Sequence, residues 1–257
     1  MTSEREELLV DLADNVLVIT INRPHARNAI TQAVAEDIAA ALDLLDSRDD
    51  LSVGVITGAG GAFCSGMDLK AFARGERPRV EGRGFAGLTE APPRKPLIAA
   101  VEGPAVAGGW EIVLACDMVV AARTARFGLP EVKRGLVATA GGLLRLPNRV
   151  SEQLAMEFAL TGDLLLAERA YQIGLVNRLS EEGEALRTAL DLAATISANG
   201  PLAVEASKRV IRQHTRWPEE ERFARQRLIT DPVIASADAA EGARAFAEKR
   251  PPRWTGR

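Results

Sequence analysis

Two glutamates in the middle of the chain have the residue type and the surroundings that acid–base catalysis uses. Glu111 lies in AGGWEI, inside a run from Lys95 to Ala122 whose apolar sequence is interrupted also by Glu102 and Asp117, and Glu131 lies in RFGLPEVKRG. An ionised carboxylate without a partner is costly to bury, so Glu111 either reaches the surface or has a function. Two carboxylates in one apolar pocket shift each other's pKa, as acid–base pairs do. For Glu131, a place at a helix start after Pro130 is the simpler explanation.

Glycines near Glu111 and earlier in the chain can leave backbone N–H groups free. In CSGMDL, Gly66 permits a tight turn, and Asp68 is a candidate N-cap for a helix that begins at Leu69. In AGGWEI, Gly108 comes just before a short helix, so an N–H group there can also lack a partner. Two such turns that meet would hold a developing oxyanion. Glycine spacing alone, however, favours ordinary turns.

Three other classes of site fit the sequence less well. VGVITGAGGAF begins like a dinucleotide-binding turn, but Phe63 occupies the last glycine position of G-x-G-x-x-G. Ser65 does not lie in the G-x-S-x-G motif of a serine hydrolase. The two cysteines and two histidines are too scattered for a zinc cage or a disulfide framework. Cys64 and Cys116 have apolar neighbours, so we expect both to be buried packing residues.

Length and composition predict one large globular domain, or one with a small appendage. The chain has 257 residues, of which 47% are apolar and 26% charged, and its net charge of −3 gives no basic field for nucleic acid. No apolar stretch reaches the roughly 18 residues of a membrane span, and the acidic first residues lack a secretory signal, so we predict a cytoplasmic protein. Between Lys70 and Lys95, seven basic and three acidic residues give a local charge of +4, which fits a solvated loop or a region near an anionic ligand.

Short β-branched segments alternate with helical periodicity over the first two thirds of the chain. Buried strands are predicted at residues 16–21, 53–57, 97–101 and 118–122. Helices are predicted after a Thr31 cap, at 151–160, at 167–174 and at 201–216. The pattern indicates an α/β core with both sheet faces covered, followed by a helical layer of about 60 residues.

Several separated blocks resemble the crotonase, or enoyl-CoA hydratase/isomerase, superfamily. They occur in the family's order over nearly the whole chain, which is far more specific than a single glycine motif. The blocks are ITINRPHARNAI, VITGAGGAFCSGMDLKA, KPLIAAVEGPAVAGGWEIVLACDMVVAA, ARFGLPEVKRGL with GGLLRLP, LTGDLLLAERAYQIGLVNRL and EGARAFAEKRPPRW. Within the superfamily, the chain looks closest to the branch of carnitinyl-CoA (crotonobetainyl-CoA) hydratases and actinobacterial enoyl-CoA hydratases.

The resemblance implies an α/β fold in which ββα units wind into a spiral, here over residues 1–197. Residues 198–257 would form a C-terminal helical region that builds a homotrimer or a dimer of trimers. The substrate would be an acyl-CoA thioester, so coenzyme A arrives as part of the substrate and neither a separate cofactor nor a metal is expected.

The resemblance also assigns the reacting groups. The two backbone amides of the family's oxyanion hole fall on Met67 and Gly108, and its two hydratase glutamates fall on Glu111 and Glu131. In that mechanism the glutamates hold a water against the β-carbon of a 2-enoyl thioester. Glu111 activates the water, and Glu131 delivers a proton to the α-carbon. Glu111 would then be buried because its partner is a catalytic water.

Contacts to CoA are implied in three parts of the chain. Two basic residues flank the turn after the first predicted strand, Arg23 and Arg27, and a neighbouring subunit would contribute Phe246 and Lys249. The loop before the second helix would contribute Cys64, Ser65, Gly66, Asp68 and Leu69. Two positions depart from the usual hydratase pattern and could reshape the acyl pocket: Thr139 stands where glycine is usual, and Trp110 is bulkier than the usual residue.

We therefore predict an enoyl-CoA hydratase that adds water reversibly to a 2-enoyl-CoA. A Δ3-Δ2 enoyl-CoA isomerase of the same fold is an alternative, although the presence of both glutamates argues against it. A non-catalytic acyl-CoA binding protein is another, in which Thr139 and Trp110 would displace the water. A nicotinamide oxidoreductase is the most distant alternative.

Overall fold

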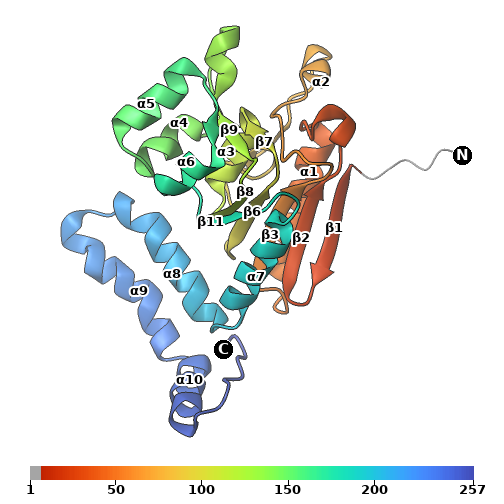
Figure 1. Ribbon diagram of the computed structural model, residues 1–257. Coiled ribbons are helices and arrows are strands. Elements are labelled where there is room, and N and C mark those ends of the chain that lie inside the picture. Colours follow the sequence, from red (N-terminus) through yellow and green to blue (C-terminus); the bar gives the residue numbers. More distant parts are fainter. Residues whose placement is uncertain (1–6) are drawn as a thin grey trace, which may run out of the picture.

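A six-stranded sheet forms the centre of the protein (Figure 1). The computed structural model describes residues 7–257. The strand order is β1-β2-β3-β6-β8-β11; β1 pairs with β2 antiparallel, and every other pair is parallel. The strands are β1 (Leu8–Ala13), β2 (Val16–Ile21), β3 (Val53–Gly58), β6 (Leu97–Val101), β8 (Met118–Ala122) and β11 (Arg178–Ser180). The four predicted strands are confirmed, and β1 and β11 were not predicted.

Both faces of this sheet are covered by helices, as the two-sided apolar strands predicted. Successive side chains of a strand point to opposite faces. On β2, therefore, Leu17 and Ile19 belong to the core beneath α1 (Gln32–Ser47), whereas Val16 and Val18 pack with α7 (Ala185–Ser197). The predicted cap of α1 is confirmed, because the Thr31 side chain accepts from the amide of Val34.

A smaller sheet and a series of short helices lie beside the main sheet and build the functional region. The small sheet has the order β10-β9-β7, and β4 pairs with β5 in a separate hairpin. These strands are β4 (Arg79–Val80), β5 (Gly84–Phe85), β7 (Pro104–Val106), β9 (Arg126–Gly128) and β10 (Leu165–Leu166). The helices are η1 (Pro24–Ala26), α2 (Leu69–Ala73), α3 (Gly108–Ala115), η2 (Pro130–Arg134), α4 (Gly142–Arg145), η3 (Leu146–Asn148), α5 (Glu152–Thr161) and α6 (Ala167–Gln172). Strands this short carry no readable periodicity, so the sequence did not predict them.

The residues after α7 form a helical layer that extends away from the sheet (Figure 1). It contains α8 (Pro201–Gln213), η4 (His214–Arg216), η5 (Glu219–Glu221), α9 (Arg222–Ile234) and α10 (Ala237–Glu248). The C-terminal helical region is confirmed, and the predicted boundary after residue 197 falls in the connection between α7 and α8. Across residues 7–257, no helix combines the length and the apolar character needed to cross a bilayer.

An ion cluster fastens this C-terminal layer to the core. Asp117, just before β8, accepts from Lys208 at 2.6 Å and from Arg212 at 2.8 Å, both on α8. It also accepts from the amide of Leu97 at 2.8 Å. The side chains of Asp117 and Lys208 are exposed by only 14% and 12%. Each charge therefore has the hydrogen-bond partners that a largely buried ion pair requires.

Replacing Asp117 with alanine would leave Lys208 and Arg212 without their counter-charge. We expect the free energy of unfolding to fall by about 3 to 5 kcal/mol, the usual cost of breaking a buried pair from one side. Urea denaturation followed by circular dichroism measures this change. The matched control is Arg187→Ala, which removes only exposed ion pairs on α7 and should barely move the urea midpoint. Equal effects of the two substitutions would contradict the role assigned to this cluster.

Candidate active site

The turn that leads into α3 is held in a strained conformation. Ala107 has φ 52° and ψ −130°, a combination that residues other than glycine rarely adopt. Its N–H donates to the carbonyl of Gly128 at 2.8 Å, and its carbonyl accepts from the amides of Trp110 and Glu111 at 2.9 and 3.1 Å. These bonds fix the first turn of α3 and therefore the position of the Glu111 side chain.

A second turn, at residues 64–68, lies directly against the first. The carbonyl of Gly66 accepts from the amide of Ile30 at 2.8 Å, which ties this turn to the start of α1. A Cβ on Gly66 would lie 3.0 Å from the amide nitrogen of Gly108, so only glycine allows this approach. Within residues 7–257, the N–H groups of Met67 and Gly108 have no hydrogen-bond acceptor. Two unpartnered backbone donors on touching turns are the arrangement that an oxyanion hole needs.

Glu111 is buried, with an exposed fraction of 3%. One of its carboxylate oxygens, Oε1, accepts from the amides of Ala140 and Gly142 at 2.8 and 2.9 Å. Burial raises the pKa of Glu111 to about 7, while the two backbone hydrogen bonds oppose this rise. Near neutral pH the side chain can therefore accept or release a proton, as a general acid or base must.

Glu131 supplies a second carboxylate close enough to influence the first. It follows Pro130 at the start of η2, as the sequence predicted. Burial also raises the pKa of Glu131, and among the described residues its buried Oε2 atom has no hydrogen-bond partner. The charge of Glu131 in turn raises the pKa of Glu111. A buried acceptor without a partner fits a position that water or substrate completes.

The loop at residues 139–142 supplies both amides that hold Glu111. Gly142 lies so close that a Cβ there would be 3.0 Å from Cγ of Glu111. Gly141 before it has φ 94°, in the left-handed region that favours glycine. Sequence reasoning named Thr139 in this loop but missed Ala140 and Gly142. The signal that could have found them is the pair of glycines that follows Glu131 in the chain.

Comparison with known proteins identifies the family. The sequence pattern of the enoyl-CoA hydratase/isomerase family matches residues 11–257. The chain belongs to this family. It is 42% identical to enoyl-CoA hydratase EchA19 of Mycobacterium tuberculosis over 98% of this chain and 97% of that protein, and 43% identical to carnitinyl-CoA dehydratase of Salmonella typhi over 94% and 95%. The crystal structure of enoyl-CoA hydratase EchA1 from Mycobacterium marinum matches with a TM-score of 0.97 and 60% identity over 98% of this chain and 100% of that one. The predicted crotonase-like fold is therefore confirmed.

The two arginines that the family resemblance assigned to CoA have different environments. Arg23 is buried and forms ion pairs with Glu7 at 2.8 Å and with Asp68 at 3.0 Å. Asp68 also caps α2, as predicted, because its Oδ1 accepts from the first amides of that helix. Most donors of Arg23 are thus engaged within the chain, so Arg23 holds this loop, and a contact of Arg23 with CoA stays a prediction. Arg27 is exposed, and among residues 7–257 its guanidinium has no ion-pair partner.

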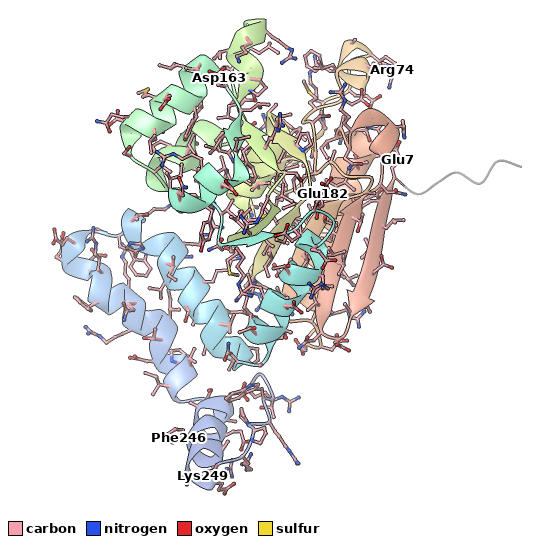
Figure 2. All side chains as sticks on the ribbon, in the orientation of Figure 1. Glu7, Arg74, Asp163, Glu182, Phe246 and Lys249 are labelled. Carbon is pink, nitrogen blue, oxygen red and sulfur yellow. The ribbon has the colours of Figure 1, made fainter. Side chains whose placement is uncertain are left out.

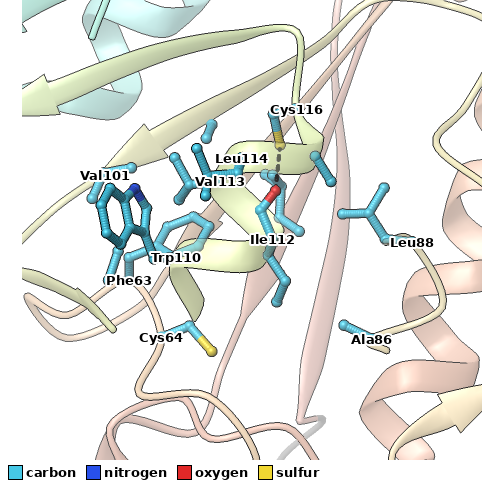
Figure 3. Packing of buried hydrophobic residues seen from close by; sticks show 14 of the residues in the cluster. Phe63, Cys64, Ala86, Leu88, Val101, Trp110, Ile112, Val113, Leu114 and Cys116 are labelled. Atoms are coloured by element: carbon cyan, nitrogen blue, oxygen red, sulfur yellow. Dashed lines mark hydrogen bonds between the residues drawn. The ribbon is translucent and has the colours of Figure 1, made fainter. Parts of the chain in front are cut away.

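Trp110 packs in the hydrophobic core (Figure 3). Its ring centroid lies 6.2 Å from that of Phe127 and 6.3 Å from that of Phe158, and only 1% of the residue is exposed. Trp110 is therefore part of the core, and its effect on the shape of the acyl pocket stays a prediction. Thr139, by contrast, is exposed on the loop that holds Glu111. Its effect on acyl preference stays a prediction.

The remaining loop residues assigned to CoA lie on the second turn. Cys64 is buried, and burial raises its pKa to about 12, so it is a packing residue as the sequence predicted. Ser65 is half-buried, and Leu69 is 56% exposed. A contact of this turn with CoA stays a prediction. Among residues 7–257, no three His, Cys, Asp or Glu side chains gather as metal ligands do.

Phe246 and Lys249 lie at the tip of the C-terminal layer (Figure 2). This layer extends away from α3, which carries Glu111 (Figure 1). The Phe246 residue is 88% exposed. In this conformation neither residue reaches the active-site region of its own chain, so a contact with CoA would require a second subunit.

Glu111→Gln removes a carboxyl group whose pKa is about 7 in the folded protein instead of the ordinary 4.5. Between these pH values the folded chain keeps a proton that the unfolded chain has released, so this group's contribution to stability falls as the pH rises and is constant above about 7. Glutamine does not titrate, so the variant does not lose stability at this position as the pH rises. We expect its free energy of unfolding, relative to wild type, to increase by up to about 3 kcal/mol from pH 4.5 to pH 7.5. Urea denaturation across this pH range measures the difference, and a pH-independent result would contradict the raised pKa.

Proposed function

We propose that this protein is an enoyl-CoA hydratase that adds water reversibly across the double bond of a 2-enoyl-CoA thioester. The observation that carries the proposal is the pair Glu111 and Glu131, two carboxylates with raised pKa, beside the unpartnered amides of Met67 and Gly108. Relatives described as enoyl-CoA hydratases support the same class of reaction. Coenzyme A enters as part of the substrate, and the reaction needs no separate cofactor.

The thioester carbonyl oxygen becomes negatively charged when water adds to the β-carbon. In the proposed mechanism the N–H groups of Met67 and Gly108 donate to this oxygen. Donors that are already in place need no reorganisation during the reaction, and removing one from such a site typically costs about 10²- to 10³-fold in rate. The strained Ala107 and the close approach at Gly66 keep the two donors together.

Water addition requires that one proton be removed and another delivered. The Glu111 carboxylate takes a proton from water while the water oxygen bonds to the β-carbon, and the double-bond electrons form the enolate. Protonated Glu131 then gives its proton to the α-carbon, and the enolate returns to the thioester. Exchange with solvent restores both carboxyl groups, and the same steps in reverse dehydrate the product. A water between the two side chains would also partner the buried Oε2 of Glu131.

The alternatives predict different use of the same residues. A Δ3-Δ2 enoyl-CoA isomerase moves a proton between two carbons and needs no second carboxylate to hold a water. The presence of both Glu111 and Glu131 in one electrostatically coupled site therefore favours the hydratase. A non-catalytic acyl-CoA binding protein, in which Trp110 would displace the water, is less favoured because Trp110 packs in the core against Phe127 and Phe158.

Loss of the enoyl-thioester ultraviolet absorbance on crotonyl-CoA tests the proposal. The assay is repeated with longer, branched and crotonobetainyl thioesters, and their relative rates rank the acyl groups. Binding is measured in parallel by calorimetry. If the thioesters bind but none loses absorbance, the hydratase proposal fails. A 3-enoyl-CoA assay, in which absorbance would rise, then tests the isomerase.

Glu111→Gln and Glu131→Gln should each lower kcat by about 10²- to 10⁴-fold, because each removes one of the two proton transfers. Affinity for CoA thioesters should change little, since neither side chain is placed at the CoA end. Stopped-flow kinetics on crotonyl-CoA and calorimetry measure the two quantities. Glu157→Gln, on the exposed face of α5, is the matched control and should keep wild-type turnover. Unchanged turnover in either site variant would remove that residue from the mechanism.

The proposal includes a homotrimer, or a dimer of trimers, assembled through residues 198–257. Support comes from large apolar residues on α8, α9 and α10 that a monomer would leave in water. Five of them are between 69% and 88% exposed: Ile211, Phe223, Leu228, Ile234 and Phe246. Light scattering tests this assembly, and the 27.5 kDa mass of a single chain would contradict it. A cytoplasmic location stays a prediction.

Lys249→Ala should weaken binding through the CoA end of the substrate if this residue reaches a neighbouring subunit's site. We expect a KM several-fold higher for crotonyl-CoA, with kcat nearly unchanged. Crotonyl-N-acetylcysteamine lacks the CoA phosphates and is the matched control, because its kinetics should not respond to the substitution. An effect confined to acyl-chain preference would contradict this placement.

A further inference from the structure

Arg145, the last residue of α4, joins two backbone segments that lie far apart in the sequence. Its guanidinium donates to the carbonyl of Thr89 and, at 3.4 Å, to the carbonyl of Ala140. The left-handed Gly141 makes room for it, since a Cβ at that position would overlap the guanidinium. None of the roles considered above for the catalytic groups or for CoA uses this side chain.

The first segment is the loop that holds Glu111. The amide of Ala140 donates to Glu111 Oε1 at 2.8 Å, while the carbonyl of the same residue accepts from Arg145. The guanidinium therefore bonds the same residue whose amide holds the Glu111 carboxylate. A shift of this loop would move the amides of both Ala140 and Gly142 away from Glu111.

The second segment, residues 85–89, forms a wall over the turn at Ala107 and Gly108, which we call the oxyanion turn. Phe85 lies against Gly108, because a Cβ on Gly108 would be 2.6 Å from its ring. At the other end of the wall, Thr89 is 1% exposed. Gly87 packs against the backbone of α1, which anchors the wall to the core. Arg145 thus connects a wall that touches one oxyanion donor with the loop that holds the general base.

We propose that Arg145 is a positioning residue, which locks the loop around Glu111 to the wall over the oxyanion turn by donating to the carbonyls of Thr89 and Ala140 together. A planar guanidinium suits this task because its donors are fixed in a rigid fork. Lysine carries the same charge but offers a single ammonium group on a flexible stem. Replacing Arg145 with lysine therefore keeps the positive charge but removes the rigid fork of donors.

The charge of Arg145 has a second consequence for Glu111. Two charged groups act on this carboxylate: Glu131 raises its pKa, and Arg145 lowers it. Arg145 itself has a lowered pKa from burial and from the cations of Arg212 and Arg216, which face it from α8 and η4. Removing the guanidinium should thus move the pKa of Glu111 further above its present value. Hydration that depends on ionised Glu111 would then need a higher pH.

Arg145→Gln and Arg145→Lys, with Arg149→Gln as the matched control, test the proposal. Arg149 is another largely buried arginine that donates to backbone carbonyls, but these belong to Leu114 and Cys116 at the end of α3. Hydrogen–deuterium exchange over residues 139–143 measures the lock, because the amides of Ala140 and Gly142 are held by Glu111. Exchange there should become about tenfold faster or more in both Arg145 variants, as expected for loss of a charge-assisted hydrogen bond, and should stay unchanged in Arg149→Gln.

The kinetic readout rests on the proposed hydratase function. For Arg145→Gln, we expect kcat to fall roughly 10- to 100-fold, the scale of a displaced catalytic group, with KM within a few-fold of wild type. The acid limb of its pH profile should move to higher pH. For Arg145→Lys, kcat should also fall while the acid limb stays near the wild-type position, because the charge is kept.

The outcomes separate this inference from the proposed function. Wild-type exchange and wild-type kcat in Arg145→Lys would overturn the lock, as would equal exchange changes in Arg149→Gln. If Arg145→Gln does not fold, Arg145→Lys carries the test through its exchange rates. If the wild type hydrates no thioester while exchange responds as expected, the positioning role stands and the hydratase assignment fails.

Discussion

A carboxylate kept away from water beside a second carboxylate is the constraint on which this structure depends. Glu111 is nearly fully buried, and the charge of Glu131 acts on it directly. Such an arrangement is tolerated only where hydrogen bonds offset part of the desolvation cost. Here the backbone supplies them through the amides of Ala140 and Gly142. The pKa near 7 that results from this balance is what makes proton transfer feasible at neutral pH.

Much of the surrounding chain holds three segments close together: the turn at residues 64–68, the turn at residues 107–108 and the loop at residues 139–142. At Gly66 and Gly142 a Cβ atom would press against Gly108 and Glu111, and Ala107 has an unfavourable backbone conformation at the start of α3. Strain of this kind persists only where the surroundings over-determine the geometry. The surroundings here are a sheet covered on both faces and a buried aromatic group, in which Trp110 of α3 packs against Phe127 and Phe158.

The C-terminal layer reaches the same helix from its other end. Arg212 on α8 donates to the carbonyl of Ala115, the last residue of α3, and pairs with Asp117 two residues later. The layer that carries the exposed apolar side chains is therefore bonded to the helix that carries Glu111. A cation beside the last carbonyls of a helix is favourable for its dipole. The C-terminal layer and α3 are consequently linked by direct contacts.

The sequence by itself determined the longer elements of the core and the family. The periodicity of residues 16–21 and 53–57 and the caps at Thr31 and Asp68 depend on local properties, and the structure confirms them. The separated family blocks also identified the fold, because they recur in order along the whole chain. Buried Glu111 was recognisable because a carboxylate in an apolar run needs a partner.

Only the tertiary structure decided which groups serve those residues. Ala140 and Gly142 hold Glu111 through backbone amides, which carry no side-chain signal and lie about 30 positions further along the chain. Arg145 acts through its guanidinium, but its acceptors are the backbone carbonyls of Thr89 and Ala140, which carry no side-chain signal either. For the same reason, Arg23 could be recognised as basic but not as already paired with Glu7 and Asp68. The sequence likewise showed that Trp110 is large but not where its side chain points. Orientation and long-range pairing depend on packing among distant segments, which spacing along the chain does not encode.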